Sequence, residues 1–251
     1  DTHNQGFIPY AAGAFFARNR RVVDFITQEA AYVFDLDEAE QEQPMGEKLR
    51  NLGQYILEGS KSGASAAAVH VTHRVLPLHH DGFGKVLRPT VLAAERFVYL
   101  AEDVAKRLAD KVTLKIPFST DTDVVCLTVN PKGNHDLGKC NAFNRALFAG
   151  MKVDRNRPVQ SQAFIGSYTS LTAGGLPDAQ RERILSELDL PPEALKELPD
   201  TGTGEADHLF LLRHTLMNPW LLFEDHRGAT WVERYWEYLE GRILAELDAL
   251  G

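Results

Sequence analysis

The segment Gly59-Ser60-Lys61 combines residue types that favour anion binding at the start of a helix. A helix is predicted over residues 60–76, because its body is rich in alanine and Pro77 ends it. The first turn of a helix presents unpaired N–H groups, and the helix dipole favours negative charge there. Two interpretations stay open: a phosphate-type anion site, or a plain helix cap with Lys61 in solvent.

Histidines and cysteines do not complete a metal site in this sequence. His70 and His73 are spaced i, i+3, and His79 and His80 follow in an expected turn, but no cysteine or carboxylate completes a set. The cysteines, Cys126 and Cys140, lie 14 positions apart and show no zinc spacing. We therefore expect no metal, and two unpaired buried thiols in a reducing cytoplasm.

Composition indicates a globular protein and excludes some function classes. The chain has 251 residues, of which 44% are hydrophobic and 25% charged, and this is ordinary for a folded domain. Its net charge of −8 argues against a nucleic-acid partner. No apolar run is long enough to span a membrane, so no membrane association is expected. The first residue is Asp1, which predicts a piece of a longer protein.

The periodic segments predict helices first and a mixed domain after residue 110. A buried strand and turn are expected at 7–17, an acidic loop at 35–50, and a turn at 79–84. Further strands are expected at 112–116, 124–129, 163–169 and 209–213, and helices at 20–26, 90–109, 137–151 and 229–250, with a helix and a proline-rich turn within 178–200. The resulting sheet is expected to carry its helices on one side.

The helix expected at 90–109 has the strongest periodicity. Thr90 is a candidate N-cap. One apolar face is formed by Val91, Ala94, Val98, Ala101 and Ala105.

Five separated motifs carry a resemblance to a known family. They are the first ten residues (DTHNQGFIPY), residues 55–63 (YILEGSKSG), residues 73–78 (HRVLPL), residues 128–134 (TVNPKGN) and residues 212–219 (LRHTLMNP). In type and order they resemble the group II pyridoxal-phosphate (PLP) amino-acid decarboxylases, and the tyrosine and aromatic-L-amino-acid decarboxylases most closely.

The resemblance implies an α/β fold of the fold-type I PLP-dependent transferase kind. Residues 1–85 would be the C-terminal end of the PLP-binding large domain, and residues 86–251 the complete small C-terminal domain. The expected partners are an amino-acid substrate, the upstream N-terminal half of the same protein and a second subunit in a homodimer. In the family, the residues that stack on the cofactor and pair its ring nitrogen lie in that upstream half.

The resemblance also assigns roles to residues near the cofactor. Asp1 and His3 would flank the cofactor phosphate and imine, and Gly59-Ser60-Lys61 would reach the phosphate of the neighbouring subunit. Tyr32 would donate a proton from a mobile loop that excludes water on closing, although a packed ring is an equal alternative.

Residues 213–218 receive weaker expectations. Arg213 ends an apolar strand, where a charge needs a partner, so it would bind the substrate carboxylate or form a structural ion pair. For His214 and Asn218, packing and turn capping are favoured over a place at the mouth of the active site.

Asn4 departs from the family pattern at its central position. The family places there, directly after the histidine, the lysine that holds PLP as an imine and assists transimination. An amide nitrogen cannot form that imine. Two hypotheses follow: a PLP-dependent decarboxylase of a tyrosine-like L-amino acid, or an inactive protein of the same fold. A third possibility is that the natural protein has lysine and that Asn4 is an engineered or misread residue.

Overall fold

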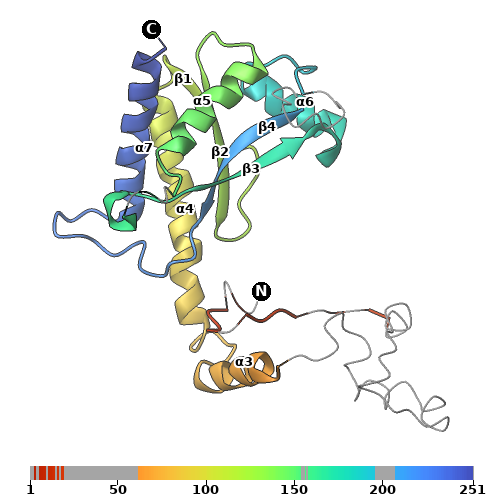
Figure 1. Cartoon of the computed structure of the whole chain (residues 1–251), viewed down its shortest axis with the longest axis vertical. Coiled ribbons are helices and arrows are strands. Elements are labelled where there is room, and N and C mark those ends of the chain that lie inside the picture. Colours follow the sequence, from red (N-terminus) through yellow and green to blue (C-terminus); the bar gives the residue numbers. More distant parts are fainter. Residues whose placement is uncertain are drawn as a thin grey trace. The chain divides into compact units, whose positions relative to one another are not determined.

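The computed structural model describes residues 3, 6–9, 11–14, 16, 18–19, 62–153, 156, 158–195 and 207–250. The chain divides into two compact units, Asp1–Phe83 and Gly84–Gly251. The described helix of the first unit is α3 (Ala64–Val75). The second unit contains α4 (Gly84–Arg107), β1 (Val112–Lys115), β2 (Val124–Pro131), α5 (Leu137–Ala149), β3 (Ser167–Thr172), α6 (Asp178–Glu187), β4 (His208–Thr215) and α7 (Trp231–Asp248) (Figure 1). Two short 3-10 helices lie at Val159–Ser161 and Ala173–Gly175.

Helix α3 begins later than the predicted start at Ser60, because Ser62 lies outside it and Gly63 is its N-cap, and it ends where the sequence predicts, just before Pro77. Gly63 is its N-cap and makes no side-chain capping bond, and no residue of the helix is buried within this chain. The expected turn at 79–84 follows, closed by bonds from the N–H groups of His79 and Phe83 to the Pro77 carbonyl. Gly82 is required in this turn, because a Cβ there would lie 2.3 Å from the Pro77 oxygen.

The prediction of a buried strand at 7–17 is wrong for the described residues of that segment. They adopt no strand conformation, and Phe16 is 90% exposed. Phe7 has a positive φ of 52°, which is incompatible with an extended strand. A single apolar side chain of this run, that of Ile8, is buried among the described residues, with 1% of its surface exposed.

The second unit is built on a four-stranded antiparallel sheet with strand order β1-β2-β4-β3. One face carries Val125, Leu127 and Leu212, which pack against α4, α5 and α7. The other face carries Leu209 and Leu211, which pack against α6, the residues that follow it and the start of α5. The expectation that helices cover one side only is thus corrected: α6 packs on the opposite face, beside the start of β4 (Figure 1).

Two asparagines of α5 hold β2 and β4 where the ladder between these strands ends. The ladder runs from Val124↔Thr215 to Leu127↔Leu212. Beyond it, the buried Asn144 side chain accepts from the Val129 N–H at 2.9 Å and donates to the Val129 carbonyl at 2.8 Å. Asn141 accepts from the Phe210 N–H at 2.8 Å and donates to the His208 carbonyl at 2.7 Å. Side-chain amides therefore replace backbone partners in the core.

The TVNPKGN motif at 128–134 forms a structural junction. Asn130 is buried, and its amide donates to the carbonyls of Leu188 and Asn134 at 2.7 and 2.8 Å. Lys132 donates to Thr113 at 2.7 Å and lies 3.1 Å from Asp189. The Thr113 hydroxyl and the Lys132 ammonium both lower the pKa of the Asp189 carboxyl, and the Thr113 hydroxyl contributes most. The motif therefore joins the end of β2 to the segment after α6.

Helix α4 begins at Gly84, and the prediction of Thr90 as its N-cap is wrong. Pro89 lies inside the helix, near its start, where a missing N–H and a displaced carbonyl disturb few bonds. Thr90 is buried, and its hydroxyl donates to the Leu87 carbonyl at 2.7 Å.

Helix α7 is a long amphipathic helix with a complete capping box. Thr230 and Glu233 satisfy each other's backbone N–H groups at its start. Its core face consists of Val232, Tyr235, Trp236, Leu239 and Ile243. Trp236 donates its indole N–H to the Phe97 carbonyl of α4 at 3.1 Å, so the two helices lie side by side (Figure 1).

Strand β3 starts later than the sequence predicts. Residues 163–166 are not in the strand, because the Gly166 N–H bonds to the Met151 carbonyl at 3.0 Å. The strand begins at Ser167 and pairs with β4 over its whole length, ending at Thr172↔His208.

In the described residues, no helix is both long and apolar enough to cross a bilayer.

Candidate functional site

His3 is fixed against the backbone of its own segment. Its Nδ1 lies 2.9 Å from the Ile8 carbonyl, which only accepts, so Nδ1 carries the proton in this bond. Phe7 adopts its positive φ between these two residues, and its ring lies 6.3 Å from that of Phe83. A non-glycine residue in this conformation stores backbone strain of about 1 kcal/mol or more. The chain therefore turns sharply directly after the DTHNQ stretch.

Gly13 and Ala14 form one wall of a groove within the first unit. The Ser65 hydroxyl of α3 donates to the Ala11 carbonyl at 2.9 Å. The groove has a volume of about 520 Å³ and is lined by Gly13, Ala14, Ala66, Val69, His70, His73 and Arg74. No atom lies within 4 Å of a Cβ built on Gly13. Small residues at this wall therefore leave space for a ligand to approach closely.

The polar wall of this groove is cationic or neutral. His70, His73 and Arg74 lie on one side of α3 because residues three and four apart share a helix face. Guanidinium and imidazole groups donate hydrogen bonds, and small opposing residues admit a flat group, so the arrangement suits an anionic or planar ligand. Sequence reasoning missed Arg74, although its spacing from His70 contained the signal. No group of metal-ligating side chains occurs among the described residues, these histidines included.

Six of the residues nominated from the sequence lie outside the described part of the chain. They are Asp1, Asn4, Tyr32, Gly59, Ser60 and Lys61. The described chain resumes at Ser62, whose hydroxyl accepts from the Ala64 N–H at 3.2 Å, directly at the start of α3. The anion-binding role of Gly59-Ser60-Lys61 therefore stays a prediction.

Arg213 is exposed, which explains a charge on an otherwise apolar strand. It pairs in register with Cys126 and Ser167, on the face opposite to its buried neighbour His214. Within the described part of the chain, no carboxylate lies within ion-pair distance of Arg213. The ion-pair interpretation thus finds no support there, and the role toward a substrate carboxylate stays a prediction.

His214 is a core residue, as the sequence favoured. Its Nδ1 lies 3.2 Å from the Val125 carbonyl, and its Nε2 accepts a short hydrogen bond from the Tyr235 hydroxyl. Burial lowers the pKa of His214 to about 4, although the bond to Val125 opposes this shift. The imidazole is therefore neutral at neutral pH. Asn218 caps a turn, since its side chain accepts from the Trp220 N–H at 2.9 Å.

Both cysteines are free, as predicted, but only Cys140 is fully buried. Burial raises the pKa of Cys140 to about 12. Cys126 is partly buried, which corrects the expectation; its burial raises the thiol pKa, and the nearby Arg213 opposes this. Neither thiol is activated as a nucleophile.

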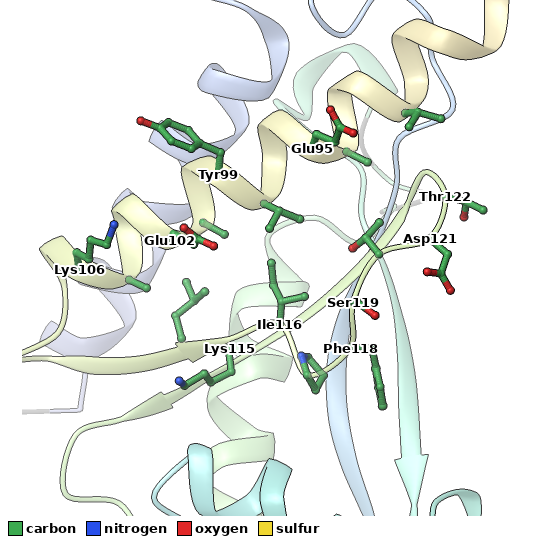
Figure 2. A pocket seen from close by; sticks show the side chains of 18 of the residues that line it. Glu95, Tyr99, Glu102, Lys106, Lys115, Ile116, Phe118, Ser119, Asp121 and Thr122 are labelled. Atoms are coloured by element: carbon green, nitrogen blue, oxygen red, sulfur yellow. The ribbon is translucent and has the colours of Figure 1, made fainter. Parts of the chain in front are cut away.

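A large cavity of the second unit contains none of the nominated residues. It has a volume of about 1240 Å³ and lies in the second unit, between α4 and residues 114–122 (Figure 2). Neither His3 nor Arg213 lines it.

Comparison with known proteins identifies relatives of one kind. No family model matches the chain. An L-tyrosine decarboxylase of Enterococcus faecium is 30% identical over 222 residues, which are 88% of this chain and 33% of that protein. L-tyrosine decarboxylases of Enterococcus faecalis and Levilactobacillus brevis are 32% and 34% identical over 67% and 59% of this chain, and over 26% and 22% of their own lengths. The chain thus spans about a third or less of these relatives, and the resemblance indicated by its motifs is confirmed.

Proposed function

We propose that this chain, a relative of the L-tyrosine decarboxylases, is the C-terminal part of a PLP-dependent decarboxylase of a tyrosine-like L-amino acid. The observation that carries the proposal is the similarity over 88% of the chain to one L-tyrosine decarboxylase. The division at Phe83 supports an assignment of the first unit to the end of the large domain and of the second unit to the small domain. A homodimer and the fold-type I architecture belong to the same proposal.

The residues that the chain supplies do not fit covalent attachment of PLP. Attachment needs a primary amine, and Asn4 offers an amide at the position where the resemblance places the lysine. The chain itself therefore contributes no group for the covalent step. Its remaining contribution would be to bind anionic groups, through the start of α3 and the Arg74 side of the neighbouring groove.

Asn4 favours a second candidate function, a non-catalytic subunit of the same fold. The two candidate functions predict different effects of an amine at residue 4. In a decarboxylase the surrounding residues would use that amine for the reaction. A subunit kept only for its fold would gain nothing from that amine.

Asn4→Lys, made in the full-length protein, tests this difference. We expect tyramine formation from L-tyrosine to rise at least about a hundredfold over the unsubstituted protein, because lysine at residue 4 would supply the primary amine that could hold the cofactor. Asn4→Gln is the matched control, since it lengthens the side chain and keeps the amide. Inactivity of both variants would favour the non-catalytic subunit. Equal activity with Asn4 and with lysine would show that the amine is dispensable.

A further inference from the structure

The groove between α4 and residues 114–122 has an apolar floor and is too large for a typical small-molecule site. Val91 and Val98 of α4 face Leu114, Ile116 and Phe118 across it. Its volume of about 1240 Å³ exceeds the range of roughly 300 to 1,000 Å³ that is usual for small ligands. From Val91 to Lys106, α4 extends for about 22 Å, which matches about seven residues of an extended chain.

One wall of this groove is the free edge of the sheet. β1 is the first strand in the order β1-β2-β4-β3, and within the described residues it pairs with β2 alone. In an antiparallel strand, about half of the N–H and C=O groups point away from the single neighbour. Leu114 and Lys115, which belong to opposite faces of β1, both line the groove, so the strand edge itself borders it. Such an edge is a template for another strand.

Charges are separated along the groove. Lys106 and Lys115 lie at one end, and Glu95 and Asp121 lie at the other, with Glu102 between them on α4 (Figure 2). Arg183 also lines the groove, but its guanidinium is paired with Glu187 at 2.7 Å and donates to the Pro117 carbonyl at 3.3 Å. Lys106 also lies 3.9 Å from Asp103, but that pair is largely exposed and therefore weak. A segment that fits would carry an acidic residue at the lysine end and a basic residue at the Glu95 end.

We propose that this groove binds an extended segment of a partner protein, which adds to β1 as a fifth, antiparallel strand. The concave shape favours a protruding segment over a second copy of the same groove. An antiparallel strand places its N-terminal end beside Asp121 and its C-terminal end beside Lys115, so the segment is basic first and acidic last. Apolar residues at alternate positions face the floor.

The test uses the 251-residue chain and two synthetic peptides with acetylated and amidated ends. The probe is Lys-Val-Thr-Val-Thr-Val-Glu, and the control exchanges only its two charged residues. We expect the probe to shift the backbone amide NMR signals of Leu114, Lys115, Ile116 and Phe118, and to bind at least about tenfold more tightly than the control. A fourfold charge exchange, Glu95→Lys and Asp121→Lys with Lys106→Glu and Lys115→Glu, should reverse that preference.

Four results would overturn the proposal, of which three concern the peptides. They are equal binding of both peptides, shifts confined to residues outside the groove, and absence of binding. A fourth is dilution-dependent shifts of residues 114–118 without peptide, because a second copy would then be the occupant. If the fourfold variant does not fold, Lys115→Glu alone decides, since it should at least halve the preference for the probe.

Discussion

Replacing Asn144 with alanine should lower the free energy of unfolding of the second unit by about 3 kcal/mol. The side chain is fully buried and satisfies both the N–H and the C=O of Val129. Its amide also donates to the Cys140 carbonyl at 2.8 Å. Alanine removes these bonds and leaves the groups of a buried strand without partners, which costs more than the bonds contribute. Urea unfolding followed by circular dichroism measures the change.

Asn218→Ala is the matched control for Asn144→Ala. Asn218 makes one exposed turn-capping bond, so its loss should cost about 1 kcal/mol or less. Equal effects of the two substitutions would contradict the view that α5 completes the core hydrogen bonding of β2.

Acid should destabilise the second unit through His214, starting well above the range in which carboxylates protonate. The pKa of His214 is about 4 in the folded chain, against an ordinary value of 6.5. A histidine with a lowered pKa contributes stability that is present above 6.5 and is lost as the pH falls toward 4. Between pH 7 and pH 4.5, we expect the free energy of unfolding to fall by roughly 2 to 3 kcal/mol from this residue.

His214→Leu should remove most of that dependence, whereas His226→Gln should leave it unchanged. His226 is exposed. Because His214→Leu also leaves the Tyr235 hydroxyl without its imidazole partner, NMR titration of the unsubstituted protein provides an independent test. A His214 imidazole that titrates near 6.5 in the folded state would contradict the account.

Helix α4 shows which parts of the fold sequence periodicity predicts. The expected apolar stripe exists, but only Ala94 and Ala101 of it are fully buried, and Val91 is 40% exposed beside the groove. The core side of the helix includes Phe97, whose ring lies 4.8 Å from both His214 and Trp236. A wide apolar surface on a helix does not specify which part of it a sheet will cover, so the sequence could not separate the core from the groove.

The hydrophobic pattern predicts a strand correctly where its apolar run coincides with the residues paired in the sheet. It fails where a contact with a residue distant in sequence determines where the strand begins. β2 and β4 were predicted because their apolar runs coincide with paired residues. The start of β3 was misplaced because the contact of Gly166 with Met151 is a tertiary interaction.

The candidate site was predictable in residue type more than in arrangement. The motifs identified the right relatives, because a motif can be recognised from its residue types without knowledge of the structure. The exposure of Arg213 follows from its register with Cys126 and Ser167, which a single sequence does not reveal. The groove beside α3 likewise depends on the bond between Ser65 and Ala11, which are distant in sequence.

The central proposal is that this chain, a relative of the tyrosine decarboxylases, supplies no residue that holds PLP covalently, since residue 4 is asparagine. Mass spectrometry after incubation with PLP and reduction by borohydride tests it most directly, because reduction fixes any imine. The account predicts no stoichiometric reduced adduct on any residue of this chain in the unsubstituted full-length protein, and an adduct at residue 4 in Asn4→Lys made in the full-length protein. A stoichiometric adduct at a single lysine elsewhere, such as Lys61, in the unsubstituted full-length protein would contradict it.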